Sequence, residues 1–403
     1  MKILLINHFP LEGSGSGTYT RNIAVHLTKL GHQVSIIFPE NVSTFSSPDG
    51  VRKHPVFFTG KENIEGALPF NFPCFTTHPR SSFTFYEMSE AQIMNYLSVF
   101  EREIKKEIEA FQPDIIHAQH IWLLSYVVSK LGYPYVVTAH GTDLMGYRKS
   151  EEFRKFAYNA AANAGRVIVI SEDIEKQVLD LFPQCEGKTL LMKNGYDNTI
   201  FYPEEVEKRT LLESFGISQI PESVVIFVGK LAYFKGVDIL LKAAKKYNHK
   251  LNDDICTLIV GAGELLETLQ STVESRSIQN IHFLGHQSQE VLRKLYSMAD
   301  VSVVPSRREP FGLVAIEALA CGTPVVATAE GGLAEIIKDD VGSLVPVEDE
   351  NALAKAIYGE LTRSDKEKRK IRAHKYAFKT YSQEKIIGEM VEVYGSLIKG
   401  NLK

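Results

Sequence analysis

The residue types and spacing best suited to chemistry lie between residues 306 and 318. Two acidic residues in that stretch, Glu309 and Glu317, are separated by seven residues. If a helix begins at Pro310, it places the two carboxylates about 12 Å apart, so they cannot share one proton. They can instead bracket an extended ligand and accept hydrogen bonds from its hydroxyl groups. A surface position for both is the alternative, but a carboxylate among the apolar neighbours of Glu317 needs a partner.

The start of the same predicted helix is suited to binding a phosphate. Pro310 favours the first position of a helix, and three amides that follow it would then be free, those of Phe311, Gly312 and Leu313. Unpaired N–H groups and the helix dipole both attract an anion at such a start. The lack of a side chain at Gly312 would let the ligand come close.

A second candidate stretch, residues 228–238, carries two lysines on one loop. Lys230 and Lys235 are five positions apart and can both reach a single diphosphate. Their charge would stabilise a departing nucleoside diphosphate without a metal ion, and no cluster of paired carboxylates suggests magnesium ligation. Two ordinary surface lysines are the alternative for this loop.

Two weaker signals lie in the first half of the chain. The glycine-rich run 13–17, with Gly15 at its centre, precedes a predicted helix, as phosphate-binding loops do. It begins seven residues after the preceding strand ends, and the tighter turn of an NAD-binding fold is missing. His140 follows another strand end and could face a sugar or an acceptor. A flexible loop and a structural histidine are the respective alternatives.

Alternating strands and helices position these stretches. Short runs rich in Val and Ile predict strands at residues 2–6, 33–38, 114–117, 134–139, 165–170, 224–228, 255–260, 281–284, 301–304 and 324–327. Helices are expected between them, at 18–30, 122–130, 172–181, 236–247, 263–274, 289–298 and 310–321. The pattern predicts an α/β protein of two Rossmann-like halves, each with a parallel sheet, that face a central cleft. Each candidate stretch follows a strand, where open α/β sheets bind ligands.

Length and composition limit the class of protein. A chain of 403 residues suits two domains, and the turn-rich stretch beginning at Asn194 places the predicted boundary between 1–197 and 198–383. The net charge of −4 gives no reason to expect nucleic acid. Four scattered cysteines without a C-x-x-C pair indicate free thiols in the cytoplasm. No apolar run is long enough to span a membrane.

Taken together, these segments resemble the retaining glycosyltransferases of family 4, which have the GT-B fold and include the bacterial group 1 enzymes. The stretch from Glu309 to Glu317 resembles the E-x7-E motif of that family, and Ala-Leu-Ala-Cys-Gly-Thr-Pro-Val at 318–325 resembles its continuation. The lysine loop is similar to the family's diphosphate-binding loop, where Arg is usual at the position of Lys230. Lysine keeps the charge but lacks the bidentate fork of Arg. The resemblance covers nearly the whole chain.

The resemblance implies roles for the residues of the second half. Glu309 would hold hydroxyl groups of the donor sugar, and Glu317 would hold those of the ribose. Lys230 and Lys235 would bind the diphosphate, together with the backbone amides of Phe311, Gly312 and Leu313.

The resemblance also implies roles for parts of the first half. Gly15 would lie across the cleft near the phosphate and the acceptor, at a place where the family often has paired glycines and this chain has Ser14-Gly15. His140 matches a histidine that faces the cleft in the family and would join the catalytic set. The last helix, within 384–403, would pack back onto the first domain.

The implied reaction is a front-face displacement with retention of configuration. A sugar would pass from a nucleotide-diphosphate sugar, UDP-sugars being the commonest donors of the family, to an acceptor hydroxyl, with no metal or other cofactor. Acceptors would be carbohydrates, lipid-linked molecules or small molecules. A sugar-nucleotide epimerase of similar architecture and a non-catalytic nucleotide-binding scaffold are the alternatives, and an NAD dehydrogenase ranks last.

Two surface features leave alternatives open. Residues 55–86 are unusually aromatic and form either an acceptor-binding or membrane-facing loop or, as we favour, a connection packed on the first sheet. Peripheral contact with the inner face of a membrane could involve the basic residues Arg148, Lys149, Arg154 and Lys155. Because Glu151 and Glu152 interrupt these residues, a solvated helix is favoured.

Overall fold

The chain folds into two α/β units. The computed structural model describes residues 1–45, 48–193, 195–250, 254–309 and 311–401. One unit comprises Met1–Lys193 with Ile387–Lys403, and the other comprises Asn194–Ile386. These divisions lie four and three residues from the expected ones at 197 and 383. Asn194, where the turn was expected to begin, lies outside the described residues.

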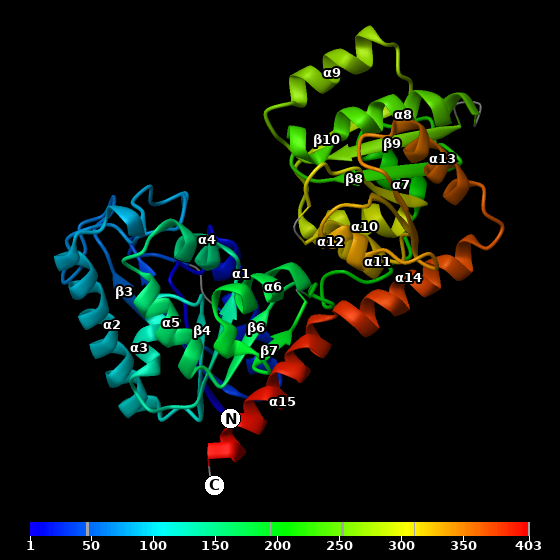
Figure 1. The fold of residues 1–403 in the computed structure, drawn as a ribbon. Helices are drawn as coiled ribbons and strands as arrows, with labels where there is room; N and C mark the ends of the chain where they lie inside the picture. The colour runs from blue at the N-terminus through cyan, green and yellow to red at the C-terminus, as the bar shows by residue number, and fades with distance from the viewer. Residues whose placement is uncertain (46–47, 194, 251–253, 310, 402–403) are drawn as a thin grey trace. The chain divides into compact units, whose positions relative to one another are not determined.

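The first unit is built on a parallel sheet with strand order β3-β2-β1-β4-β5-β6-β7 (Figure 1). Its strands are β1 (Lys2–Ile6), β2 (Gln33–Glu40), β3 (Arg52–Phe57), β4 (Ile115–Gln119), β5 (Tyr135–Ala139), β6 (Arg166–Val169) and β7 (Thr189–Leu191). The five strands expected in this half are confirmed. The edge strands β3 and β7 were not expected, because Pro55 and polar residues interrupt the first and the second has only three residues.

Helices cover this sheet, and one of them comes from the end of the chain. They are α1 (Gly15–Lys29), α2 (Glu90–Phe111), α3 (Leu123–Ser129), α4 (Thr142–Lys149), α5 (Arg154–Asn163), α6 (Glu172–Leu181) and α15 (Gln383–Asn401). The side chains of Ile387, Met390 and Tyr394 on α15 are buried in the same core as Ile3 and Leu5 of β1. The last helix therefore packs on the first unit.

The second unit has a parallel sheet with strand order β10-β9-β8-β11-β12-β13. Its strands are β8 (Ser223–Val228), β9 (Ile255–Val260), β10 (Ile281–Gly285), β11 (Val301–Val304), β12 (Val325–Thr328) and β13 (Gly342–Val345). Its helices are α7 (Lys208–Glu213), α8 (Val237–Lys250), α9 (Leu266–Ser275), α10 (Gln289–Met298), α11 (Leu313–Ala320), α12 (Gly332–Ile336), α13 (Glu350–Leu361) and α14 (Lys366–Tyr381). The strand order reverses between β8 and β11, and parallel sheets bind ligands at such a switch point.

The aromatic segment between β3 and α2 is packed rather than free. Five of its rings are almost inaccessible to solvent, those of Phe58, Phe70, Phe72, Phe75 and Phe85. Phe58 contacts Tyr96 of α2, and Phe75 contacts Trp122. The interpretation of this segment as a packed connection is confirmed.

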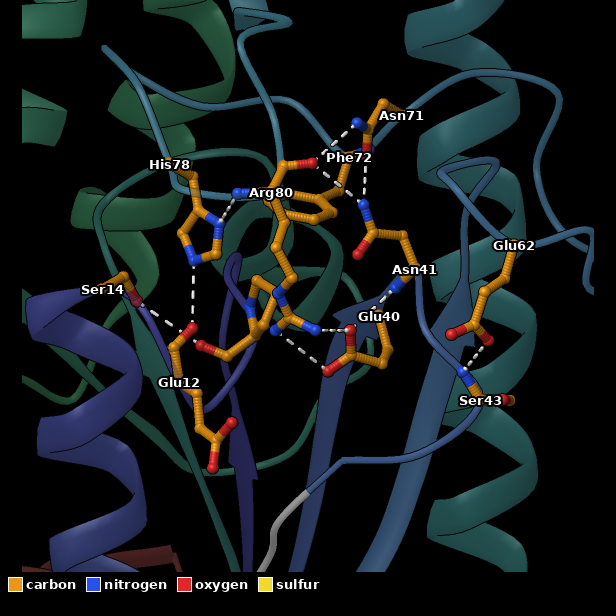
Figure 2. A network of polar contacts seen from close by, with 11 residues as sticks. Glu12, Ser14, Glu40, Asn41, Ser43, Glu62, Asn71, Phe72, His78 and Arg80 are labelled. Carbon is orange, nitrogen blue, oxygen red and sulfur yellow. Dashed lines mark hydrogen bonds and ion pairs between the residues drawn. The ribbon is translucent and has the colours of Figure 1, made fainter.

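Polar contacts tie the same segment to the loop that follows β1 (Figure 2). The Nε2–H of His78 donates to the carbonyl oxygen of Glu12 at 3.0 Å, while its Nδ1 accepts from the amide of Arg80 at 3.1 Å. Arg80 also forms an ion pair with Glu40, which is 1% exposed at the end of β2. The segment therefore braces the backbone just before α1.

None of the helices formed by the described residues combines the length and apolar character that a membrane span requires.

Candidate active site

An ion pair joins the two candidate loops of the second unit. Lys235 ends a short 3₁₀ turn, Tyr233–Lys235, after β8, and Glu309 follows β11. The Nζ of Lys235 lies 2.6 Å from Oε2 of Glu309, and the two side chains are only 18% and 8% exposed. The next residue, Gly236, has a φ of +67°, and a Cβ there would collide with the carbonyl oxygen of Pro305. The close approach of the two loops therefore depends on this glycine.

The carboxylate of Glu309 also has neutral donors. The Ser306 hydroxyl donates to Oε2 at 3.3 Å, and the amide of Gly312 donates to Oε1 at 3.2 Å. Ser306 is itself fixed, because the hydroxyl of Thr328 donates to its carbonyl oxygen at 2.6 Å. Both carboxylate oxygens of Glu309 therefore accept hydrogen bonds from the protein. These bonds fix the orientation of the carboxylate and of its remaining lone pairs.

The start of α11 differs from the expected one. The helix begins at Leu313, with Gly312 as its N-cap at a φ of +75°, and Pro310 lies outside the described residues. The expectation of a free amide at Gly312 is wrong, because this amide donates to Oε1 of Glu309. The amides of Phe311 and Leu313 form no hydrogen bond with another described residue. Since Glu309 precedes the helix, helical rise does not set its distance from Glu317.

Lys230 lies outside the ion pair. Its side chain is 61% exposed, and its nearest acidic neighbour is Glu264 at 3.7 Å, which is 60% exposed. Such exposed pairs contribute little, so Lys230 remains available to an anion. Arg308 is likewise exposed and pairs with no other described residue, although sequence reasoning gave it no role.

Sequence reasoning also missed Arg307, which fixes both loops. Its guanidinium donates to both carboxylate oxygens of Asp238, at 2.8 and 2.9 Å, and to the carbonyl oxygen of Tyr233 at 2.7 Å. It also pairs with Glu348. Its hydrogen bonds to Asp238 raise the pKa of Arg307 above its usual range. Asp238 is 69 residues from Arg307 in the chain, so no local pattern could have predicted this bidentate contact.

Glu317 lies four residues into α11 and is half-buried. Burial raises the pKa of its carboxyl group to about 7. Its neighbours include Tyr296 and Cys321, and the Glu317 charge helps to raise the pKa of each, after burial itself. The carboxyl group has no hydrogen-bond donor among the described residues. The acceptor capacity of Glu317 is therefore unused in the protein alone.

Four histidines of the first unit lie close together on β4 or just after β1, β4 and β5: His8, His117, His120 and His140. His140 binds Oε1 of Gln119 through Nε2 at 2.9 Å and lies 4.7 Å from the ring of His120. Burial lowers the pKa of His140 to about 3, and that of His8 and His117 equally far. His140 is therefore uncharged at neutral pH and cannot act there as an imidazolium acid.

The glycines before and within α1 have different reasons to be glycine. At Gly13, where φ is +84°, a Cβ would lie 2.8 Å from Nε2 of His78, and at Gly17 it would collide with the carbonyl oxygen of Pro10. At Gly15 a Cβ would meet nothing within 4 Å. Ser14 caps the helix through the amide of Gly17. The helix begins at Gly15 itself, three residues earlier than expected.

The structure thus gathers the candidate residues into two groups, one in each unit. Glu309 contacts both Lys235 and the amide of Gly312, and Phe311 and Leu313 lie on the same segment as Gly312. In the other unit, Tyr19 of α1 lies 5.3 Å from the His140 ring, which brings the start of α1 near His140. No three His, Cys, Asp or Glu side chains among the described residues are gathered as metal ligands.

Comparison with known proteins identifies both units. The model of the family described as Glycosyltransferase Family 4 matches residues 13–199, and that described as Glycosyl transferases group 1 matches residues 213–393. The chain is 30% identical to a D-inositol 3-phosphate glycosyltransferase of Geodermatophilus obscurus, over 80% of this chain and 76% of that protein.

Solved structures share the fold over nearly the whole chain. Sucrose-phosphate synthase from Thermosynechococcus elongatus superposes with a TM-score of 0.70 at 24% identity, covering 99% of this chain and 100% of that one. The Anabaena protein HepE in complex with UDP superposes with a TM-score of 0.69 at 18% identity, covering 98% and 100%. The chain therefore belongs to the family 4 and group 1 glycosyltransferases, enzymes with the GT-B fold.

Proposed function

We propose that this enzyme transfers a sugar from a nucleotide-diphosphate sugar to an acceptor hydroxyl, with retention of configuration and without a metal ion. The observation that carries the proposal is the contact among Lys235, Glu309 and the Gly312 amide at the ends of β8 and β11. It combines a positive charge for a leaving diphosphate with fixed carboxylate oxygens for sugar hydroxyl groups.

Lys235 can serve Glu309 and a phosphate at once. An ammonium group has three N–H donors, and Glu309 accepts one of them. The other donors can bind oxygens of the diphosphate, and the exposed ammonium of Lys230 can add charge from the same loop. The amides of Phe311 and Leu313 extend the set of donors. Positive charge that is fixed before the reaction stabilises a departing anion without reorganisation.

In the proposed reaction the acceptor hydroxyl attacks the anomeric carbon of the donor sugar from the face that the diphosphate leaves. The new carbon–oxygen bond forms as the bond to the phosphate oxygen breaks, and that electron pair departs with the diphosphate. The hydroxyl proton passes to an oxygen of the same phosphate, so no separate base is required. His140 enters as a neutral hydrogen-bonding group, since its pKa lies far below 7.

Glu317 is proposed to bind the ribose of the donor. Its carboxyl group is half-buried without a donor among the described residues, and two ribose hydroxyl groups would supply donors. We propose UDP as the nucleotide, because HepE was crystallised with UDP. The acceptor would be a carbohydrate, a lipid-linked molecule or a small polyol such as an inositol phosphate, which the name of one relative contains. The four free, buried cysteines suit a cytoplasmic enzyme.

A donor screen tests this proposal. Thermal unfolding is measured with UDP, GDP, ADP and their sugars in the presence of a chelator, and a ligand at 100 times its Kd should add about 2.7 kcal/mol of stability. The donor found is then incubated with and without acceptors, and the anomeric configuration of the product is read by NMR. Retained configuration and unchanged activity in chelator are expected. An inverted product, a metal requirement, or an epimerised donor formed without acceptor would each refute the proposal.

A further inference from the structure

Helix α14 has an unusual charge for this chain. Its sixteen residues include seven Lys and Arg and a single acidic residue, Glu367, although the whole chain has a net charge of −4. The helix packs on α11 in the second unit (Figure 1, orange). Its buried side consists of Arg369, Ala373, Ala377 and Tyr381. The opposite side is therefore presented to solvent.

The solvent side carries large apolar groups among the lysines. Ile371 is 55% exposed and Phe378 is 45% exposed. They are seven residues apart, or about two helical turns, so they lie on the same side of the helix. Three exposed lysines flank them. We call this set the α14 stripe: Lys368, Ile371, Lys375, Phe378 and Lys379.

Three cations of α14 are paired, among them Lys366, which lies 4.0 Å from Asp300. Arg369 pairs with Glu360 inside the unit, and Arg372 pairs with Asp365. In contrast, the three lysines of the stripe form no ion pair with another described residue. The nearest exposed acid on the helix is Glu367. The stripe thus keeps its positive charge.

Helix α2 shows the usual arrangement for comparison. Its exposed bases are neutralised along the helix, since Lys105 pairs with Glu101, while Arg102 and Lys106 pair with Glu103. Such pairs between residues three or four positions apart are usual on a solvent-exposed helix. Within the described part of the chain, the lysines of the α14 stripe have no paired acid. The ring of His374 lies 6.1 Å from that of Phe378, yet Phe378 and Ile371 remain 45% and 55% exposed.

We infer that the α14 stripe binds the surface of an anionic lipid bilayer. Lysines attract acidic headgroups, and exposed apolar side chains between them can enter the boundary between headgroups and acyl chains. A nucleic acid or another polyanion would need the lysines but would leave Ile371 and Phe378 in water. A second copy of the stripe would be repelled by its like charge. The inference concerns binding only, so it does not depend on the proposed reaction.

In the alternative basic surface of the first unit, each basic side chain contacts a neighbouring side chain. Arg154 pairs with Glu151, and Arg148 donates to the side chain of Gln177. Lys149 lies over the ring of Tyr86 at 3.9 Å. Lys155 lies over the ring of Phe156 at 4.9 Å. All four residues for which the sequence suggested membrane contact are therefore engaged by neighbouring side chains, so α14 is the stronger candidate.

Vesicle flotation with the full chain tests the inference. Binding is expected to vesicles with about 30% phosphatidylglycerol in phosphatidylcholine, and not to pure phosphatidylcholine, and it should weaken with salt. Lys368→Gln with Lys375→Gln should weaken binding about 25-fold, since each lysine near such a surface contributes roughly fivefold. The matched control is Lys242→Gln with Lys245→Gln, two exposed lysines of α8 in the same unit, which should bind as the wild type does.

The apolar positions separate a bilayer from other polyanions. Ile371→Ser with Phe378→Ser should weaken vesicle binding at least tenfold while leaving the unfolding temperature unchanged, because both side chains are exposed. Met94→Ser, at a 61% exposed position on α2, should have no effect. The inference is overturned if vesicles are not bound, if the serine variants bind as well as the wild type, or if heparin is bound and vesicles are not.

Discussion

The two groups of candidate residues differ in how they hold charge. In the second unit, the loops after β8 and β11 are joined by ionised side chains, Lys235 with Glu309 and Arg307 with Asp238. In the first unit, His120 follows β4 and His140 follows β5, and burial keeps both neutral at pH 7. The same type of sheet therefore supports an edge of ion-paired side chains in one unit and an edge of neutral histidines in the other.

This difference suits the two partners of a transfer reaction. A departing diphosphate carries charge and gains from fixed cations, whereas an acceptor hydroxyl is neutral and needs only hydrogen-bonding groups beside it. The comparison predicts that charge changes in the second unit mainly affect the donor, and that acid mainly affects the first unit.

The largest expected effect comes from removing the charge of Glu309. Glu309→Gln keeps an acceptor for the amide of Gly312 but leaves Lys235 without its counter-charge. We expect kcat/KM to fall by about 10²–10³, the usual loss for a fixed electrostatic contact in a transition state. The measurement is steady-state kinetics, together with the unfolding temperature.

Glu290→Gln is the matched control for this change. Glu290 forms an exposed ion pair with Lys294 on α10 of the same unit, and such pairs contribute at most about 0.5 kcal/mol. Its activity should stay within twofold of the wild type. Equal losses in the two variants, or none in either, would remove Glu309 from the reaction.

The charged edge was predictable from the sequence only in part. The strands that precede Lys235 and Glu309 were found because runs such as Val301–Val304 are short, apolar and β-branched. Their direct ion pair was not, since 74 residues separate them and the sequence assigned each to a different part of the ligand. Gly312 was expected to let a ligand come close, whereas the structure shows that its φ of +75° and the nearby side chain of Leu333 already favour glycine. The amide of Gly312 is also used by the protein, because a buried N–H requires a partner and Glu309 is the nearest one.

The neutral edge was less predictable still. His140 was singled out by its place after a strand, but its neutrality depends on burial among His8, His117 and His120, which come from other strands and loops. Local sequence gives no measure of that burial. The role of residues 55–86 was likewise left open, because only the fold shows that His78 and Arg80 brace the loop before α1.

The second prediction concerns acid stability. His8, His117 and His140 have pKa values of about 3 in the folded chain and an ordinary value of 6.5. Below pH 6.5 the unfolded chain takes up protons that the folded unit excludes, so each histidine removes up to ~1.4 kcal/mol per pH unit. We therefore expect the first unit to lose several kcal/mol between pH 6.5 and pH 5.

Hydrogen exchange followed by mass spectrometry at pH 7, 6 and 5, corrected for the intrinsic rate, reports the two units separately. Peptides of β4 and β5 should lose protection before those of β8 and β11. His117→Gln, which removes one titrating ring, should make the loss shallower. Loss of protection in the second unit first would contradict the contrast drawn between the two edges.

A third prediction concerns the carboxyl group of Glu317 and donor affinity. Its pKa is raised to about 7, and hydroxyl groups that donate to it would stabilise the ionised form. Affinity for UDP should therefore be highest above pH 7 and fall as the pH drops through 7, by at most about tenfold per unit. Titration calorimetry from pH 5.5 to 8.5 measures this slope.

The Glu317→Gln variant should bind UDP with the weak affinity that the wild type shows at low pH. That affinity should not change with pH. Glu335→Gln, at another acidic position of the same unit, should retain the slope of the wild type. If the Glu317→Gln variant and the wild type showed slopes of the same size, the titration would belong to another group, such as the phosphate itself.

The smallest expected effect is a difference in stability between alanine substitutions at two glycines near the start of α1. Gly13→Ala should destabilise the first unit, since its φ is +84° and the new Cβ would strike His78. Gly15→Ala meets open space, and alanine is the better helix former by roughly 0.5–1 kcal/mol, so its unfolding temperature should be unchanged or slightly higher. If a substrate packs against the start of α1, the methyl group of Gly15→Ala should raise the KM for that substrate severalfold without changing the stability of the fold. Comparing the KM values for donor and acceptor would then show which substrate the neutral edge receives, and unchanged values for both would mean that Gly15 lies outside the site.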